Sequence, residues 1–211
     1  MAIKEIKSKI NDNKQEKERK LLNTALHLFS EKGIKKTSIQ DIVKDAGIAK
    51  GTFYLYFKDK YELQDVLLAK TSHELFSKAC KEATQQQFDR LDDKIVFIID
   101  SIINELIVRP NILKFIQKNL SLGLYSEKLT DLLDSEELTD LLDSEELRIK
   151  ELFVNEVKEK DIPLEYPEMT LFMIIELVSS TVFTSIVESH PLPIEEFKPH
   201  LYKTIRLLIN E

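Results

Sequence analysis

Eight consecutive positions, 50–57, hold the side chains best suited to recognise another molecule. At about 100° per residue, Phe53 and Phe57 fall on one side of a helix over this segment. The opposite side offers an ammonium, a glycine that permits close approach of the backbone, a phenol and an apolar tip that could meet a thymine methyl group. These residues are Lys50, Gly51, Tyr54 and Leu55, and Thr52 in the first turn could present its hydroxyl to a phosphate.

The residues that commonly perform catalysis lack a productive spacing. None of the four histidines has a glutamate three positions before it, so the di-iron helix motif is absent. His73-Glu74 begins like a zinc-protease motif, but Ser77 stands where the second histidine should be. Cys80 has no cue to a catalytic partner, and no phosphate-binding, dinucleotide-binding or nucleophile-elbow motif occurs. We therefore expect no enzyme activity, no catalytic residue, no metal and no cofactor.

The apolar residues recur at helical spacing nearly throughout, and no segment sustains the alternation of a strand. The sequence therefore predicts an all-α fold of about nine helices. Their expected ranges are 16–31, 38–46, 50–57, 59–83, 91–108, 110–120, 125–160 with interruptions, 168–189 and 195–209.

Signals for helix ends frame the segment at 50–57. Gly33 and Gly47 are expected to stop the first two helices. Thr37 and Gln40 have the spacing of a capping box that opens the second helix. Two short helices joined by residues 47–49 have the dimensions of a helix-turn-helix, whose second helix enters the DNA major groove.

A perfect tandem repeat occupies residues 129–146, where the nine residues from Leu129 to Glu137 recur from Leu138 to Glu146. Nine residues are about two and a half helical turns, so a continuous helix would point the two sets of leucines to opposite faces. We expect a break between the copies, or an exposed loop. The EF-hand spacing with its turn glycine is absent, so the acidic residues do not predict a calcium site.

Three stretches of the chain, in order, closely resemble the N-terminal domain of TetR-family (tetracycline-repressor-like) transcriptional regulators. They are LLNTALHLFSEKG at 21–33, TSIQDI at 37–42 and AGIAKGTFYLYFKDKYEL at 46–63. The resemblance covers about residues 17–66. It implies a homodimer whose two recognition helices read a pseudo-palindromic operator, and a repressor that a small-molecule effector releases from DNA.

The resemblance also implies roles for individual residues. At the family's positions, Thr37 begins the second helix near phosphate, Gln40 reaches a base or the backbone, and Lys60 contacts phosphate. Two departures are Ala49, where family members usually have Ser or Thr, and Leu55, where they often have His. The predicted DNA-binding residues are Thr37, Ser38, Gln40, Lys50, Gly51, Thr52, Tyr54, Leu55 and Lys60.

The helices after residue 62 agree in number and length with the family's ligand-binding and dimerisation domain. Aromatic side chains on its central helices could line an apolar cavity, although plain core packing is the alternative for each. Glu176, a carboxylate within an apolar run, could meet a cationic effector or an interface partner. The predicted effector pocket is Phe97, Phe115, Tyr125, Phe153, Phe172 and Glu176; the predicted dimer interface is Leu171, Ile175, Val178, Val182, Ile186, Leu201, Ile205 and Leu208.

Charge is unevenly distributed along the 211 residues, whose formal net charge is -7. Residues 1–62 hold 14 Lys and Arg against 9 Asp and Glu, and the remainder holds 16 against 28. We divide the chain into a basic N-terminal extension, 1–14, a helix-turn-helix domain, 15–62, and an effector-binding and dimerisation domain, 63–211. The extension is expected to be either a solvated tail or an arm that lies along a DNA groove.

No apolar signal-peptide region opens the chain, and a single cysteine fits a reducing compartment. The apolar run 169–187 carries Glu176 at its centre, which favours a core or interface helix over a membrane span. We therefore expect a cytoplasmic regulator that binds operator DNA. The alternative is a DNA-binding or scaffolding protein of the same fold without a small-molecule effector.

Overall fold

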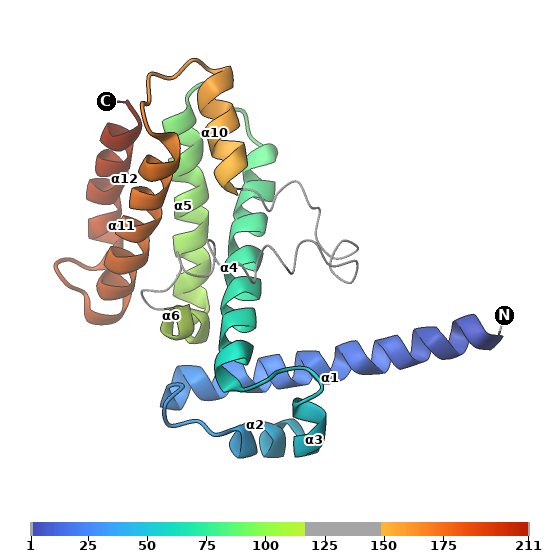
Figure 1. Ribbon diagram of the computed structural model, residues 1–211. Coiled ribbons are helices and arrows are strands. Elements are labelled where there is room, and N and C mark those ends of the chain that lie inside the picture. The colour runs from blue at the N-terminus through green and yellow to red at the C-terminus, as the bar shows by residue number, and fades with distance from the viewer. Residues whose placement is uncertain (1, 117–148, 211) are drawn as a thin grey trace. The chain divides into compact units, whose positions relative to one another are not determined.

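The computed structural model describes residues 2–116 and 149–210, which form nine α-helices and no strand (Figure 1). The predicted all-α fold is confirmed for this part of the chain. The tandem repeat at 129–146 and the predicted pocket residue Tyr125 lie outside the described residues.

The chain divides into two compact units, Met1–Leu67 and Leu68–Glu211. It passes from one to the other within helix α4 (Lys60–Thr84). This boundary lies farther along the chain than residue 62, because the first turns of α4 contribute the buried Leu63 and Leu67 to the first unit.

The first unit consists of α1 (Ala2–Lys32), α2 (Ile39–Ala46), α3 (Lys50–Phe53) and the start of α4. Helix α1 packs on α2, and α2 packs on α3. The apolar stripe predicted on the first helix is its buried side. The core of this unit includes Leu21, Leu22, Ala25, Leu28, Phe29, Ile42, Val43, Phe53, Phe57 and Leu63.

Helix α1 begins at Ala2, well before the predicted start at residue 16 (Figure 1). No glycine or proline occurs between Ala2 and Lys32, and once a helix has formed, each further residue adds one hydrogen bond. The basic extension, which the sequence placed outside any helix, is therefore the N-terminal part of a long one.

Glycines end the first two helices as predicted. Gly33 has φ 75° and donates its N–H to the Phe29 carbonyl at 3.0 Å. Gly47 has φ 67° and forms the C-cap of α2. Both residues adopt the left-handed conformation that glycine permits without strain.

The N-cap of α2 differs from the predicted one by one residue. Ser38 Oγ accepts the Asp41 N–H at 3.1 Å, and Asp41 Oδ2 accepts the Ser38 N–H at 2.9 Å, which completes a capping box. The hydrogen bonds from Ser38, that of its side chain first, hold the pKa of Asp41 below its usual value. Thr37 and Gln40 do not form the predicted box, because the Thr37 hydroxyl donates to the Gly33 carbonyl instead.

Helix α3 is shorter than predicted, since it ends at Phe53 rather than Phe57. The residues after it form hydrogen-bonded turns: the Leu55 N–H donates to the Thr52 carbonyl, and the Phe57 N–H donates to the Phe53 carbonyl. Ala49, at the N-cap, offers no side-chain hydrogen bond, so the cap that Ser or Thr would supply is missing as expected.

The second unit contains the rest of α4 and five further described helices. These are α5 (Leu91–Val108), α6 (Pro110–Ile116), α10 (Ile149–Glu159), α11 (Pro167–Glu188) and α12 (Ile194–Asn210). Helix α12 packs on both α5 and α11, and α10 packs on α11, as Figure 1 shows. Isoleucine and leucine dominate the core, with Ile102, Ile103, Ile174, Leu201, Ile205 and Ile209 almost fully buried.

Ion pairs join α12 to α5. Asp92, buried near the start of α5, accepts hydrogen bonds from Arg90 at 2.9 Å and from Arg206 of α12 at 3.1 Å. The Arg90 bond is the main cause that lowers the pKa of Asp92 to about 2. Lys198 of α12 donates to Asn104 at 2.7 Å and lies 3.2 Å from Asp100, so a second polar contact joins the same two helices.

Helix α11 is the one described helix with the length and composition of a membrane span, and 44% of that apolar stretch is buried inside the protein. Its inward side and that of α12 hold most of the residues predicted to form a dimer interface. Leu171, Ile175, Val178, Val182, Leu201 and Ile205 are buried in the core of their own unit, and Ile186 and Leu208 are half-buried. The six buried side chains are therefore not free to contact a second subunit.

Candidate nucleic-acid interface

Two aromatic rings anchor the inner side of residues 50–57. Phe53 is fully buried, Phe57 is nearly so, and their ring centroids lie 5.7 Å apart. The Tyr56 hydroxyl donates to the Lys14 carbonyl of α1 at 3.2 Å, which ties the turn after α3 to the first helix. These contacts fix which side of the segment faces outward, and it is the side that the sequence predicted.

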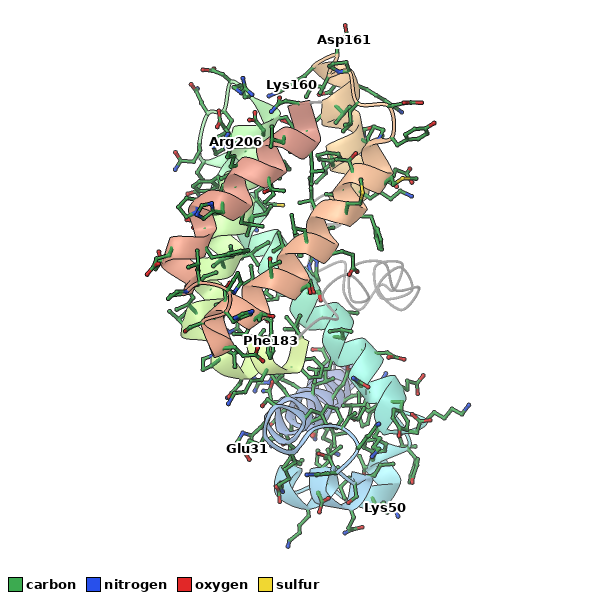
Figure 2. The ribbon with its side chains drawn as sticks, turned by 90° about the vertical axis from the view of Figure 1, so that its left-hand side faces the viewer. Glu31, Lys50, Lys160, Asp161, Phe183 and Arg206 are labelled. Carbon is green, nitrogen blue, oxygen red and sulfur yellow. The ribbon has the colours of Figure 1, made fainter. Side chains whose placement is uncertain are left out.

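The outer side carries the residues predicted to meet DNA. Lys50 and Gly51 are exposed and Thr52 is half-buried; Figure 2 labels Lys50 at the start of α3. Tyr54 is 52% exposed and Leu55 80% exposed. The Tyr54 ring stands edge-on to Phe53, with centroids 5.5 Å apart, so the buried ring limits the orientation of the exposed one.

Gly51 leaves open space on this side. A Cβ built on its backbone would have no heavy atom within 4 Å. The packing of the chain itself therefore does not require a glycine at position 51. A close approach by another molecule does explain it, and we call Lys50, Gly51, Thr52, Tyr54 and Leu55 the contact surface.

Two predicted phosphate contacts are occupied within the chain. Thr37 is 1% exposed, and its hydroxyl donates to the carbonyl of Gly33. Lys60 Nζ donates to the carbonyls of Ile34 at 2.7 Å and Thr37 at 2.8 Å. Both side chains hold the loop between α1 and α2 in place, which corrects the prediction that they contact DNA directly.

Ser38 and Gln40 are exposed at the beginning of α2, so both remain candidates for DNA contact. The Ser38 hydroxyl already donates to Asp41 Oδ2 at 2.7 Å. The cations Lys44 in α2 and Lys58 after the contact surface are also exposed, which suits an anionic partner.

The second unit contains a cavity of about 620 Å³ between α4, α5, α10 and α11. Its wall is mainly apolar and includes Phe76, Ile98, Ile102, Phe153, Ile175 and Val178. The volume and the apolar lining are typical of small-molecule sites.

Among the residues predicted to line this pocket, Phe153 does so. Helix α11 turns Leu171, Ile175 and Val178 toward the cavity, so Phe172 is exposed and Glu176 is half-buried outside the lining. Phe97 packs against Phe88 with ring centroids 5.4 Å apart, and Phe115 is buried without lining the cavity. The prediction was therefore wrong for Phe97, Phe115, Phe172 and Glu176.

Sequence reasoning missed most of the cavity wall, although a signal was present. Phe76, Cys80 and Thr84 recur every four residues along α4, and α5 repeats isoleucine at 95, 98, 99 and 102. Cys80 is half-buried in this wall rather than a fully buried core residue. Among the described residues, no group of three His, Cys, Asp or Glu side chains could hold a metal ion.

Comparisons with known proteins agree with the N-terminal geometry. Residues 21–66 match the family described as "Bacterial regulatory proteins, tetR family". The "Uncharacterized HTH-type transcriptional regulator YvdT" of Bacillus subtilis is 59% identical over 44 residues, which are 21% of this chain and 23% of that protein. The match thus spans about a quarter of this curated relative's length.

Solved structures are similar over nearly the whole chain. FadR of Bacillus subtilis, in complex with stearoyl-CoA, has a TM-score of 0.61 and 17% identity over 90% of this chain and 97% of its own. A TetR-family regulator from Marinobacter aquaeolei VT8 has a TM-score of 0.61 and 16% identity over 95% of this chain and 99% of its own. At these identities the likeness is one of fold.

Proposed function

We propose that this chain, whose residues 21–66 form a tetR-family N-terminal domain, is a sequence-specific DNA-binding transcriptional regulator. The observation that carries the proposal is the contact surface, an exposed Lys50-to-Leu55 segment fixed from behind by the buried Phe53 and Phe57. A lysine, a hydroxyl, a phenol and an open glycine on one side suit the phosphates and base edges of a major groove.

The regulator acts as a homodimer in this proposal, because a pseudo-palindromic operator needs two contact surfaces. The outward side of α11 supports a contact between subunits. Met169, Phe172, Met173 and Val187 are all exposed there, and helical spacing places them on one side of α11. Leu207 adds an exposed apolar side chain on α12.

The cavity in the second unit receives a small-molecule effector, and we propose that the effector releases a repressor from DNA. Helix α4 links the two events, since Phe76 and Cys80 line the cavity while its first turns belong to the first unit. Ion pairs hold α4 to α5: Lys78 bonds to Glu105, and Glu74 bonds to Arg109 at 2.7 Å. An effector that shifts α4 would change the separation of the two contact surfaces in the dimer.

The family matched by residues 21–66 consists of regulatory proteins. We accordingly propose no catalytic role for this chain and place it in the cytoplasm, where its DNA target lies. A scaffolding protein of the same fold would need no effector, and the 620 Å³ apolar cavity favours the ligand-responsive regulator.

The experiment that tests the proposal measures binding to a duplex chosen by selection from random DNA. Lys50→Ala and Tyr54→Ala should each weaken binding at least about tenfold, because each removes a contact worth roughly 1–3 kcal/mol. Circular dichroism should show unchanged folding, since both side chains are exposed. The matched control is Lys203→Ala on α12, also exposed, which should bind like the wild type. Wild-type affinity in both test variants would remove this surface from the interface.

A further inference from the structure

The polar residues of the cavity gather at one of its ends. Helix α4 finishes at Thr84, α5 carries Lys94 in its first turn, and α10 finishes with Glu156 and Glu159 in its last turn. Lys94 Nζ lies 2.6 Å from Glu156 Oε2, so the start of α5 and the end of α10 meet there. Lys160, labelled in Figure 2 beside the end of α10, completes this polar end.

The opposite end of the cavity is apolar. Phe76 of α4, Ile102 of α5 and Val178 of α11 line it, and all three are buried. Eight residues separate Lys94 from Ile102 on α5, which correspond to about 12 Å along the helix. A ligand with polar groups along its whole length would leave them without partners against the isoleucine wall. An elongated hydrocarbon with polar atoms at one end avoids that cost.

The charges at the polar end favour an anion. Glu156 is the one carboxylate between two ammonium groups, at 2.6 Å from Lys94 and 3.4 Å from Lys160. This trio therefore carries one positive charge more than it neutralises. The remaining charged group that lines this end, Glu159, is exposed, where water and salt screen it.

We infer that the cavity binds a fatty acyl chain with an anionic head group. The chain extends toward Phe76, Ile102 and Val178, and the head group accepts hydrogen bonds from Lys94 and Lys160 in competition with Glu156. This inference rests on the proposed function, because it names the chemical class of the effector for the same cavity.

Chain length gives the first test, made with the full chain and free fatty acids of increasing length, by displacement of a fluorescent fatty acid. Each added methylene should tighten binding about fourfold until the chain reaches the apolar end, and lengthening beyond that point should add nothing. Ile102→Phe should stop the gain at a shorter chain, whereas Leu207→Phe, on the exposed side of α12, should not. Affinity that is independent of chain length would overturn the inference.

Substitutions with opposite expected signs test the head group. Lys94→Gln and Lys160→Gln should each weaken binding of the acid roughly three- to tenfold, since each removes a partly exposed charged hydrogen bond. Glu156→Gln should tighten binding, because it removes the competing carboxylate. Lys158→Gln, exposed on the same helix and outside the cavity lining, is the matched control and should change nothing. Weaker binding in Glu156→Gln, or equal binding of an alkyl trimethylammonium of the same length, would contradict the anionic head group.

Parallel titrations with acyl-coenzyme A distinguish the two sources of such a chain. Tighter binding of the free acid assigns the head group to a carboxylate, and tighter binding of the acyl-coenzyme A assigns it to phosphate; either supports the inference if the lysine variants weaken it. If no acid or acyl-coenzyme A binds while the protein still binds its selected duplex, the inference fails and the proposed function stands. If the acids bind but no duplex is ever selected, the proposed function fails and the ligand assignment stands.

Discussion

Gly51 shows how one residue separates a requirement of the fold from a requirement of function. Glycine weakens a helix relative to alanine, and α3 is already short and lacks a side-chain cap. The space beside Gly51 is open, and its backbone is not in the left-handed region, so nothing in the chain needs a glycine there. The residue instead leaves room for a partner's surface to approach the backbone of α3.

Replacing Gly51 with alanine should therefore move stability and DNA binding in opposite directions. We expect Gly51→Ala to raise the free energy of unfolding by roughly 0.5–1 kcal/mol, because alanine favours the helix. We expect its affinity for the selected duplex to fall about tenfold, because the new methyl group meets the DNA. Thermal denaturation and fluorescence polarisation measure the two effects. Unchanged affinity would mean that α3 does not approach DNA closely at this position.

Individual contact residues were only partly predictable from sequence. The 100° spacing was enough to separate Phe53 and Phe57 from Tyr54 and Leu55, because burial of two rings leaves the opposite side exposed. The role of Lys60 was not predictable in this way. Its ammonium bonds to carbonyls of a loop more than twenty residues earlier, and such a partner is set by the folded backbone rather than by local spacing.

At the scale of elements, helix ends followed from sequence where a residue imposes the stop. Gly33 and Gly47 end helices in the left-handed conformation, and α5 occupies the predicted 91–108 because Pro110 follows it. The start of α1 was missed because it has no such marker. Which side of α11 faces its own core was also missed, since this helix is apolar nearly all round.

The attachment of α12 to α5 depends on a carboxylate whose charge can be removed. Asp92 is 2% exposed and bonded to Arg90 and Arg206, and its pKa is lowered to about 2. A lowered pKa in the folded state means that the ionised form is stabilised. This contribution is therefore complete above the ordinary pKa of aspartate, about 3.9, and is lost as the pH falls through about 2.

Asp92→Asn should lower the free energy of unfolding by roughly 1–3 kcal/mol at pH 7, since it removes charged hydrogen bonds at a buried site. The difference from the wild type should shrink as the pH is lowered from 4 to 2, where the wild-type carboxylate itself becomes protonated. Urea denaturation at several pH values measures this. Asp89→Asn, exposed just before α5, is the control and should show no such trend. A difference that stays constant with pH would show that the charge of Asp92 is not what joins the two helices.

At the scale of the whole molecule, the proposal requires two copies of the contact surface and a means of pairing them. The outward apolar side chains of α11, Met169, Phe172, Met173 and Val187, meet the second need. The contact surface meets the first, and α4 is the continuous element shared by the two units of each chain. A dimer built in this way would place two α3 segments on successive major grooves of one face of a duplex.

Protection of guanine N7 from methylation tests this arrangement most directly, because N7 lies in the major groove. On the selected duplex, the wild-type protein should protect two clusters of guanines whose centres lie about one helical turn, roughly 10 base pairs, or a small multiple apart. The variant that carries both Lys50→Ala and Tyr54→Ala should protect neither cluster at the same protein concentration. Protection that persists in this double variant, or a bound wild-type protein that leaves every N7 reactive, would contradict the account.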